Sequence, residues 1–202
     1  MEKKKSGPLI VVLVIVAILF MCFSAYKSMQ NRLVTLDEGV ESAWAQVQNQ
    51  YQRRYDLIPN LVSTVKGYAA HEKEVFEEVA NARASAGGQL VISTDILEDE
   101  QAFAKFQQVQ EQLGSSLQRL LAISENYPEL KADQNFLALQ DQLEGTENRI
   151  STERMRYIEA VKEYNTSIRK FPTSLFAGSM GFTKKATFTA VSEAATAPKV
   201  EF

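Results

Sequence analysis

Residues 9–23 read LIVVLVIVAILFMCF, a run of fifteen apolar residues, and residues 24–26 extend it without a charge. The first charged side chain after the run is that of Lys27. An α-helix of eighteen residues is about 27 Å long, which is close to the thickness of the hydrocarbon core of a bilayer. The sequence therefore predicts a transmembrane helix over residues 9–26.

The lysines around this helix predict its orientation. Lys3, Lys4 and Lys5 precede it within a few residues, whereas Lys27 and Arg32 are the basic residues that follow closely. Positive charge close to a membrane helix favours the cytoplasmic side. We expect residues 1–8 to lie in the cytoplasm and the rest of the chain to lie across the membrane.

A cleaved signal peptide would show the same charged start and apolar run. Cleavage needs small residues three positions and one position before the cut, and Cys22 and Ser24 are the best such pair here. Because the run is long and helical periodicity resumes directly after it, the sequence favours a retained anchor. Lipidation of Cys22 is disfavoured, since the preceding residues 18–21 are the bulky ILFM.

A helical pattern follows the anchor from Met29 to about Ser85. Apolar residues recur at alternating three- and four-residue spacing, beginning with Leu33, Leu36, Val40, Ala43 and Val47. Pro59 interrupts this pattern, because proline lacks an amide hydrogen and its ring clashes with the carbonyl four residues earlier. Either one helix is kinked at Pro59 or a new helix starts there with Asp56 as its cap. The apolar stripe continues without a glycine-rich loop, which favours the kink.

Two further helices are predicted beyond Gly87-Gly88. The first has caps in residues 93–95, a buried face that includes Phe103, and a stop at Pro128. The second runs from about Glu129 to Phe171, and its apolar residues follow a nearly strict heptad spacing: Phe136, Leu139, Leu143, Ile150, Tyr157, Val161, Tyr164, Ile168 and Phe171. Glu147 and Arg154 occupy or flank this seam, where they either pair across an interface or form a solvated edge.

Short breaks between long helices predict antiparallel neighbours. The fold class is therefore all-α: an N-terminal transmembrane helix plus an elongated, antiparallel, up-and-down bundle of three to four long helices. We expect residues 27–190 to form the bundle. Within them, residues 171–182 are apolar without helical period, and Thr187-Phe188-Thr189 has a short extended pattern. Residues 191–202 have the composition of a disordered tail.

The composition argues against several classes of function. His71 and Cys22 are the sole His and Cys of the chain, so imidazole clusters are impossible within one copy, and no Cys-His pair pattern is present. Residues 28–202 hold 18 basic and 24 acidic side chains, and a net negative domain gains nothing from binding phosphates, so nucleic-acid binding is not expected. No nucleotide-binding or metalloprotease motif is present. We expect no enzymatic activity, no catalytic residues, no cofactor and no bound metal.

Two segments are candidates for a partner surface. One is the amide-rich stretch that contains Gln50, Arg53 and Arg54, since arginine is favoured at binding hot spots beside aromatic residues. The alternatives for this stretch are a solvated helix face and a site of hydrogen bonds between helices around Trp44 and Tyr51. The other candidate is the apolar segment with Leu175, Phe176 and Phe182, which would expose a patch to a partner or to the membrane surface if it does not pack on the bundle.

Several segments closely resemble the LemA family over about residues 29–190. The N-terminal signature lies in NRLVTLDE (31–38), Ala43-Trp44, VQNQYQRR (47–54), DLIPNLV (56–62) and GYAAHE (67–72). A second signature comprises ENRI (147–150), Arg154, Tyr157, VKEYN (161–165) and Phe171-Pro172, and Ile158 departs from it because the family usually has Asn there. The resemblance implies a bacterial, membrane-anchored, antiparallel helical bundle without catalytic residues to transfer.

We therefore expect a membrane-anchored, non-enzymatic interaction or scaffold protein of the bacterial cell envelope. Its place would be the cytoplasmic (inner) membrane, with other envelope proteins, and possible copies of itself, as partners. One alternative is a regulator of a membrane protease or of an envelope-stress or signalling partner. A remote alternative is a hydrolase that uses Glu, or Ser with Lys, in place of His.

Overall fold

The computed structural model describes residues 7–88 and 94–189, and these are almost entirely helical. Helix α1 spans Gly7–Tyr68, followed by α2 at Lys73–Gly87, α3 at Glu100–Ala122, α4 at Pro128–Lys131 and α5 at Gln134–Arg169. Short 3-10 turns cover Thr94–Glu98, Ile123–Asn126, Thr173–Leu175 and Gly178–Met180. The predicted all-α fold is confirmed.

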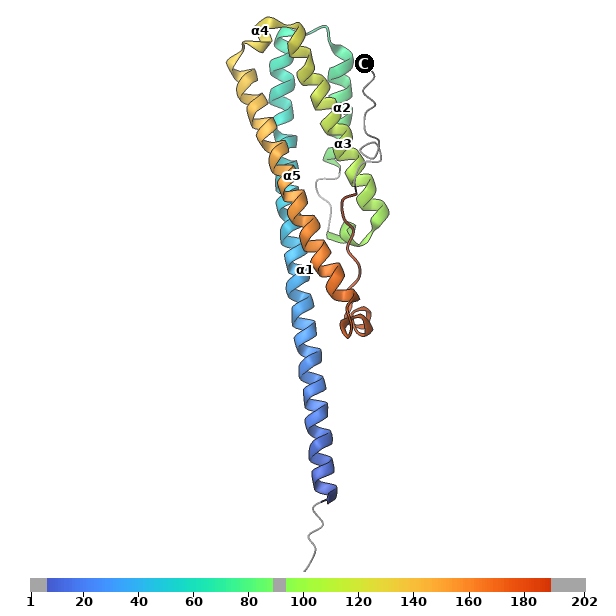
Figure 1. The fold of residues 1–202 in the computed structure, drawn as a ribbon. Coiled ribbons are helices and arrows are strands. Elements are labelled where there is room, and N and C mark those ends of the chain that lie inside the picture. Colours follow the sequence, from blue (N-terminus) through green and yellow to red (C-terminus); the bar gives the residue numbers. More distant parts are fainter. Residues whose placement is uncertain (1–6, 89–93, 190–202) are drawn as a thin grey trace, which may run out of the picture.

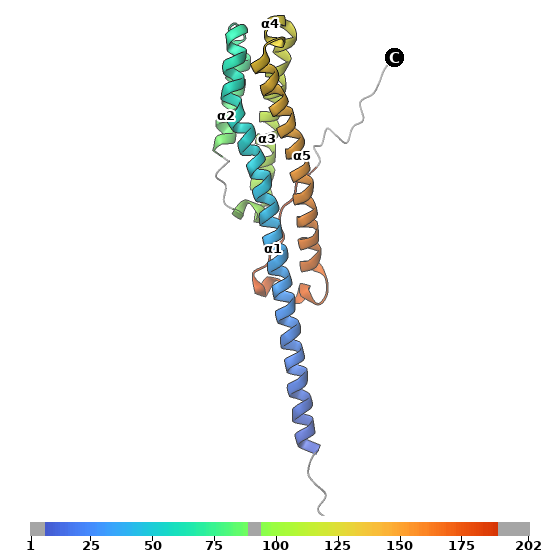
Figure 2. The same ribbon diagram turned by 90° about the vertical axis from the view of Figure 1, so that its left-hand side faces the viewer.

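The helices run up and down along one axis (Figures 1 and 2). Helix α5 packs along α1 in the opposite direction, and α2 packs against α3. Helix α4 lies at the end of the bundle where α1 turns into α2 and α3 into α5. The result is an elongated bundle built on one long helix.

The first part of α1 projects beyond the bundle, as Figure 1 shows in blue. Its large apolar side chains from Ile10 to Phe23 are 51–72% exposed. This is the one helix in the described chain that is long and apolar enough to cross a membrane, and none of its most apolar stretch is buried against protein. Residues 1–6 of the predicted cytoplasmic end lie outside the described residues.

Helix α1 continues through Pro59, so this proline does not separate two helices. The prediction of one helical segment from Met29 to Ser85 is wrong in another place, because the chain turns over residues 69–72. Ala69 in this turn is fully buried, and the amide of Glu72 donates to its carbonyl at 3.1 Å. The helix therefore ends at this turn, where Ala69 is buried, although the helical spacing of apolar residues continues through it. His71, expected on a helix, lies exposed in this turn.

Capping aspartates set the starts of the two later helices. Asp99 accepts hydrogen bonds from the amides of Gln101 and Ala102 at 2.8 and 3.0 Å, so α3 begins after the predicted caps at residues 93–95. Asp133 accepts from the Phe136 amide at 2.8 Å and begins α5. Pro128, expected to end a helix, instead begins α4, since a proline fits the first helical turn.

The heptad positions of the last helix are largely confirmed. The buried residues are Phe136, Leu143, Ile150, Tyr157, Val161, Tyr164 and Ile168, and Leu139 is half-buried. Phe171 is wrong as a core residue: it lies beyond the end of α5 at Arg169 and is 80% exposed.

The core consists of two apolar clusters stacked along the bundle axis. The Trp44 cluster includes Leu33, Val40, Trp44, Val47, Tyr51, Phe103, Phe106, Ile150, Tyr157, Tyr164 and Phe188. The Leu117 cluster includes Ile58, Leu61, Val65, Phe76, Val79, Leu113, Leu117, Leu120, Phe136 and Leu143. On α1, α3 and α5 alike, the buried residues between the two clusters are polar, and the candidate site lies at this level.

Candidate functional site

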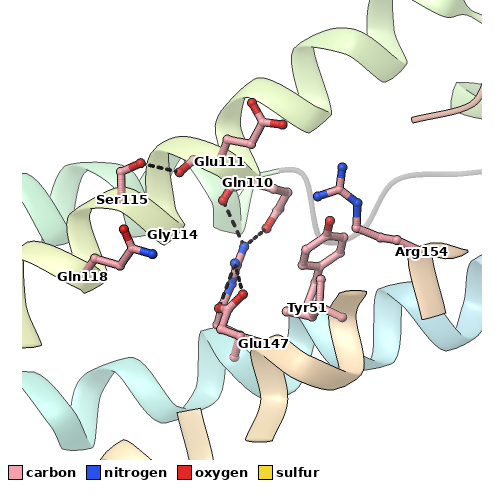
Figure 3. A pocket seen from close by; sticks show the side chains of 10 residues that line it. Tyr51, Gln110, Glu111, Gly114, Ser115, Gln118, Glu147 and Arg154 are labelled. Carbon is pink, nitrogen blue, oxygen red and sulfur yellow. Dashed lines mark hydrogen bonds and ion pairs between the residues drawn. The ribbon is translucent and has the colours of Figure 1, made fainter. Parts of the chain in front are cut away.

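Arg54 of α1 lies at the centre of a buried polar layer between the two apolar clusters. Its side chain donates from Nη1 to Glu147 Oε1 of α5 at 3.0 Å, and from Nη2 to the carbonyl and Oε1 of Gln110 in α3 at 3.1 and 2.6 Å. Arg54 and Gln110 are only 3% and 4% exposed. We call Arg54, Gln110 and Glu147 the Arg54 layer. Figure 3 shows Gln110 of α3 and Glu147 of α5 pointing toward each other across this layer.

The Arg54 layer is not fully satisfied. Arg54 Nε and Gln110 Nε2 are buried and lack a hydrogen-bond partner. The ring of Tyr51 lies beside the guanidinium, 5.1 Å from Arg54 Cζ, and burial raises the pKa of its phenol. A buried N–H group without an acceptor costs roughly 1–3 kcal/mol. The layer therefore favours an acceptor brought from outside.

Two cavities open beside this layer between α3 and α5. The first is about 360 Å³ and is lined by Tyr51, Arg54, Gln110, Gly114, Glu147 and Arg154, among others. The second is about 450 Å³, shares Gly114, Gln118 and Glu147 with the first, and continues toward Leu143 and Asn148. Because the two cavities share these three lining residues, we describe them as one surface groove, the α3–α5 groove.

Beyond the end of the groove that lies at Gln110, the space between α3 and α5 is filled by a C-terminal segment of the same chain. Residues 183–189, here named the C-terminal strap, lie there in an extended form (Figure 1, brown). The phenols of Tyr164 and Tyr157 donate to the carbonyls of Thr183 and Ala186 at 2.9 and 2.7 Å. The short extended pattern predicted at residues 187–189 thus corresponds to a packed segment.

Side-chain amides hold the main chain of the strap at two points. Asn165 accepts from the Lys185 amide at 3.0 Å and donates to its carbonyl at 2.9 Å. Gln107 accepts from the Thr189 amide at 3.2 Å and donates to its carbonyl at 2.9 Å. Each amide therefore pairs with one residue of extended backbone in the way that a neighbouring strand would.

Lys185 of the strap is a buried cation with two acidic partners. Its Nζ lies 2.9 Å from Glu98 Oε1 and 3.2 Å from Asp37 Oδ1, and its side chain is 6% exposed. Burial alone would lower the pKa of Lys185, but the contacts with Glu98 and Asp37 outweigh it and raise that pKa. The hydrogen bond from Lys185 in turn lowers the pKa of Glu98.

Replacing Lys185 with methionine should destabilise the fold by about 1–3 kcal/mol, because it leaves Asp37 and Glu98 without their shared partner. The pKa of Glu98 should rise toward its ordinary value. A carboxyl whose pKa is lowered by folding stabilises the fold above its unfolded pKa, and this contribution is lost as the pH falls through the folded pKa. The variant should therefore lose less stability on acidification than the wild type.

Thermal unfolding at several pH values, with NMR titration of Glu98, measures both effects. Lys184→Met is the matched control, since Lys184 is adjacent, exposed and paired with the exposed Glu100. Its stability should change by less than about 0.5 kcal/mol. Equal losses in the two variants would contradict the role given to Lys185.

The residues predicted to form a partner surface fall in two places. Arg54 is inside the bundle and Gln50 is half-buried, whereas Arg53 is exposed on α1. Leu175 and Phe176 lie near the start of the bundle, where the Phe176 ring is 5.9 Å from that of Tyr26. Tyr26 and Gln50 are 24 residues apart on α1, or about 36 Å. The two parts of the predicted surface are therefore separate.

The apolar part of that prediction is itself divided. Leu175 is 67% exposed and Phe176 39% exposed, so both are accessible from solvent. Phe182 is half-buried and packs against the Trp44 cluster. Within residues 7–88 and 94–189, no group of three or more His, Cys, Asp or Glu side chains is placed to hold a metal ion.

Gln107, Gln110 and Asn165 are site residues that were not predicted from the sequence. A signal for the first two was present, because they follow the buried Phe103 and Phe106 at helical spacing and so fall on the apolar face of α3. A glutamine on that face must find a buried partner. No such signal marks Asn165, whose partner is an irregular segment twenty residues further on.

The model of the LemA family matches residues 43–202, which include the Arg54 layer, the groove and the strap. The chain belongs to the LemA family. Similar proteins include magnetosome proteins MamQ 2 and MamQ 1 of Paramagnetospirillum magneticum, each 27% identical over 192 residues, covering 87% of this chain and 71% of the relative. Magnetosome protein MamQ of Magnetospirillum gryphiswaldense is 26% identical over the same shares. This LemA-family protein thus resembles MamQ across most of its length.

Proposed function

We propose that this LemA-family protein is anchored in the bacterial cytoplasmic membrane by the first part of α1, and that its bundle acts outside the cytoplasm as a non-enzymatic interaction or scaffold protein. The observation that carries the proposal is the continuity of α1. One helix contains an apolar segment that is not buried against protein and the side of the bundle core that includes Trp44. The bundle is therefore held at a fixed place relative to that segment.

The end of the bundle nearest the apolar segment supports this placement. Phe171, Leu175 and Phe176 are exposed there, at the level of Tyr26. Two exposed basic side chains belong to the same end of the bundle, since Lys27 follows Tyr26 and Lys170 precedes Phe171. Aromatic and basic residues are favoured at the headgroup layer of a membrane. We therefore place this end of the bundle against the membrane surface.

The length of α1 supports an interaction role. From Lys27 to Tyr68 the helix has 42 residues and is about 63 Å long, so the far end of the bundle reaches well beyond the membrane surface. Arg53 is exposed between the two ends, on the same helix as the buried Arg54. A rod of this length presents separate surfaces to partners close to the membrane and to partners further away.

Photo-crosslinking from the intact protein in bacterial membranes tests the proposal. A photoreactive residue at Arg53 or at Leu175, both exposed, should give adducts with other envelope proteins or with a second copy. The same residue at Lys105, which is exposed on α3 and outside the predicted partner surface, is the control. It should give at least about tenfold less adduct.

The crosslinked protein should be recovered full-length in the membrane fraction. Unmodified monomers at both test positions would contradict the interaction role. A soluble mature chain that lacks its first two dozen residues would contradict the anchor. The two parts of the proposal therefore fail separately.

A further inference from the structure

The α3–α5 groove lies directly ahead of the C-terminal strap. The strap begins beside Leu97, which lies in the 3-10 turn that precedes α3 and whose carbonyl accepts from the Ala186 amide. It then follows α3 as far as Gln107, which holds Thr189. The first cavity of the groove begins one turn further along α3, at Gln110. The chain that follows Thr189 is outside the described residues. Thr189 itself, held by Gln107, lies about one helical turn of α3 before the first cavity.

Amide side chains continue beyond the point where the strap is last seen. Gln118 on α3 and Asn148 on α5 line the second cavity from opposite sides. They are of the same chemical kind as Gln107 and Asn165, which hold the strap backbone. The groove therefore offers an extended chain the same type of contact that the strap already makes.

Two distances along different helices lead to the same position of the chain. From Gln107 to Gln118 is eleven helical residues, about 17 Å, which an extended chain covers in about five residues beyond Thr189. From Asn165 to Asn148 is seventeen helical residues, about 26 Å, or about eight extended residues beyond Lys185. Both distances end at about residues 193–194.

The sequence after Thr189 fits this space. Residues 190–197 read AVSEAATA, with one charged side chain, Glu193, and otherwise small or medium side chains. Gly114 leaves the groove without a side chain at its centre. Carbonyl groups of an extended chain are also the acceptors that Arg54 Nε and Gln110 Nε2 lack.

We propose that residues 190–197 extend the strap through the α3–α5 groove, with the main chain at residues 193–194 held by Gln118 and Asn148. The segment is joined directly to Thr189, so its effective concentration at the groove is in the mM range or above. The groove is then covered by the chain itself. A partner that uses this face has to displace the segment.

Disulfide trapping in the full-length protein in detergent tests this contact. In a Cys22→Ser background, the pair Gln118→Cys and Ala194→Cys should form an intramolecular disulfide, which needs Cα atoms within about 7 Å of each other. The control pair is Gln112→Cys with Ala194→Cys. Gln112 is also exposed on α3 but lines neither cavity. The first pair should give at least about tenfold more of the linked monomer.

Hydrogen exchange on the uncrosslinked protein is a second measurement. The amides of residues 191–196 should exchange at least about tenfold more slowly than in Gly114→Leu, whose side chain fills the groove. Gly114→Ala is the matched control, because an added Cβ would lie 3.7 Å from Arg54 Nη1, an ordinary contact. It should keep the protection.

Three results would overturn the proposal: equal disulfide yields from the two pairs, unprotected amides over residues 191–196, or disulfides that join two chains. The last result would show that a second copy occupies the groove. None of these results bears on the membrane anchor or on the crosslinks at Arg53 and Leu175, so the proposed function is tested apart from this inference.

Discussion

Replacing Glu147 with leucine should lower the free energy of unfolding by about 3 kcal/mol, because it leaves the buried guanidinium of Arg54 without a counter-charge. Arg54 is 4% exposed in its side chain, whereas the Glu147 side chain is 42% exposed. The arginine keeps its hydrogen bonds to Gln110, which places the loss at the low end of the range for broken buried ion pairs. Circular dichroism of the full-length protein in detergent should show a Tm lower by roughly 6–12 °C.

A double variant separates the cost of the stranded charge from the value of the ion pair. Arg54→Met with Glu147→Leu should recover most of the lost stability, since no buried charge then remains in the Arg54 layer. Glu144→Leu is the control, because Glu144 lies one turn away on α5 and is exposed. It should change stability by less than about 0.5 kcal/mol. A double variant as unstable as Glu147→Leu would contradict this account.

Replacing Trp44 with alanine should cost about 4 kcal/mol, the largest loss expected from a single core side chain in this bundle. Trp44 is 1% exposed, and its ring centroid lies 5.3–6.3 Å from the rings of Phe103, Phe106, Tyr157 and Phe188. The alanine would leave a cavity at the point where α1, α3, α5 and the strap meet. Chemical unfolding followed by circular dichroism measures the loss.

Two further variants make the test of Trp44 specific. Trp44→Phe should cost much less than alanine, because it keeps a ring and removes the buried Nε1, which has no hydrogen-bond partner. Phe171→Ala removes an aromatic ring of similar chemistry that is 80% exposed, and should be nearly neutral. A loss for Phe171→Ala similar to that for Trp44→Ala would show that ring packing in this cluster is not the cause.

The helices were predictable from the sequence because their signals are repeated many times. The heptad spacing from Phe136 to Ile168 corresponds to the buried face of α5, and the apolar run after Pro8 corresponds to the protruding part of α1. Each signal sums over many residues, so one irregular position does not alter it. The fold class depends on these sums and was correctly predicted.

Features that depend on a single long-range contact were not predictable in this way. The turn at residues 69–72 lies within a continuing apolar stripe and is stabilised by the burial of Ala69 at the end of the bundle. The Arg54 layer joins residues 93 and 56 positions apart. Arg54 was proposed for a partner surface because a sequence does not show whether an arginine has a buried acceptor. Hydrogen bonds between helices, one of the alternatives for that stretch, describe the surroundings of Arg54.

A continuous α1 has a mechanical consequence. Between Gly7 and Tyr68 the helix has no joint, and Pro59, the residue best suited to make one, lies far from the apolar end. A pull on the far tip of the bundle is therefore transmitted as a tilt of the apolar end, and a twist of the bundle about its long axis is transmitted as a rotation. The bundle and the apolar segment of α1 therefore move together as one rigid unit.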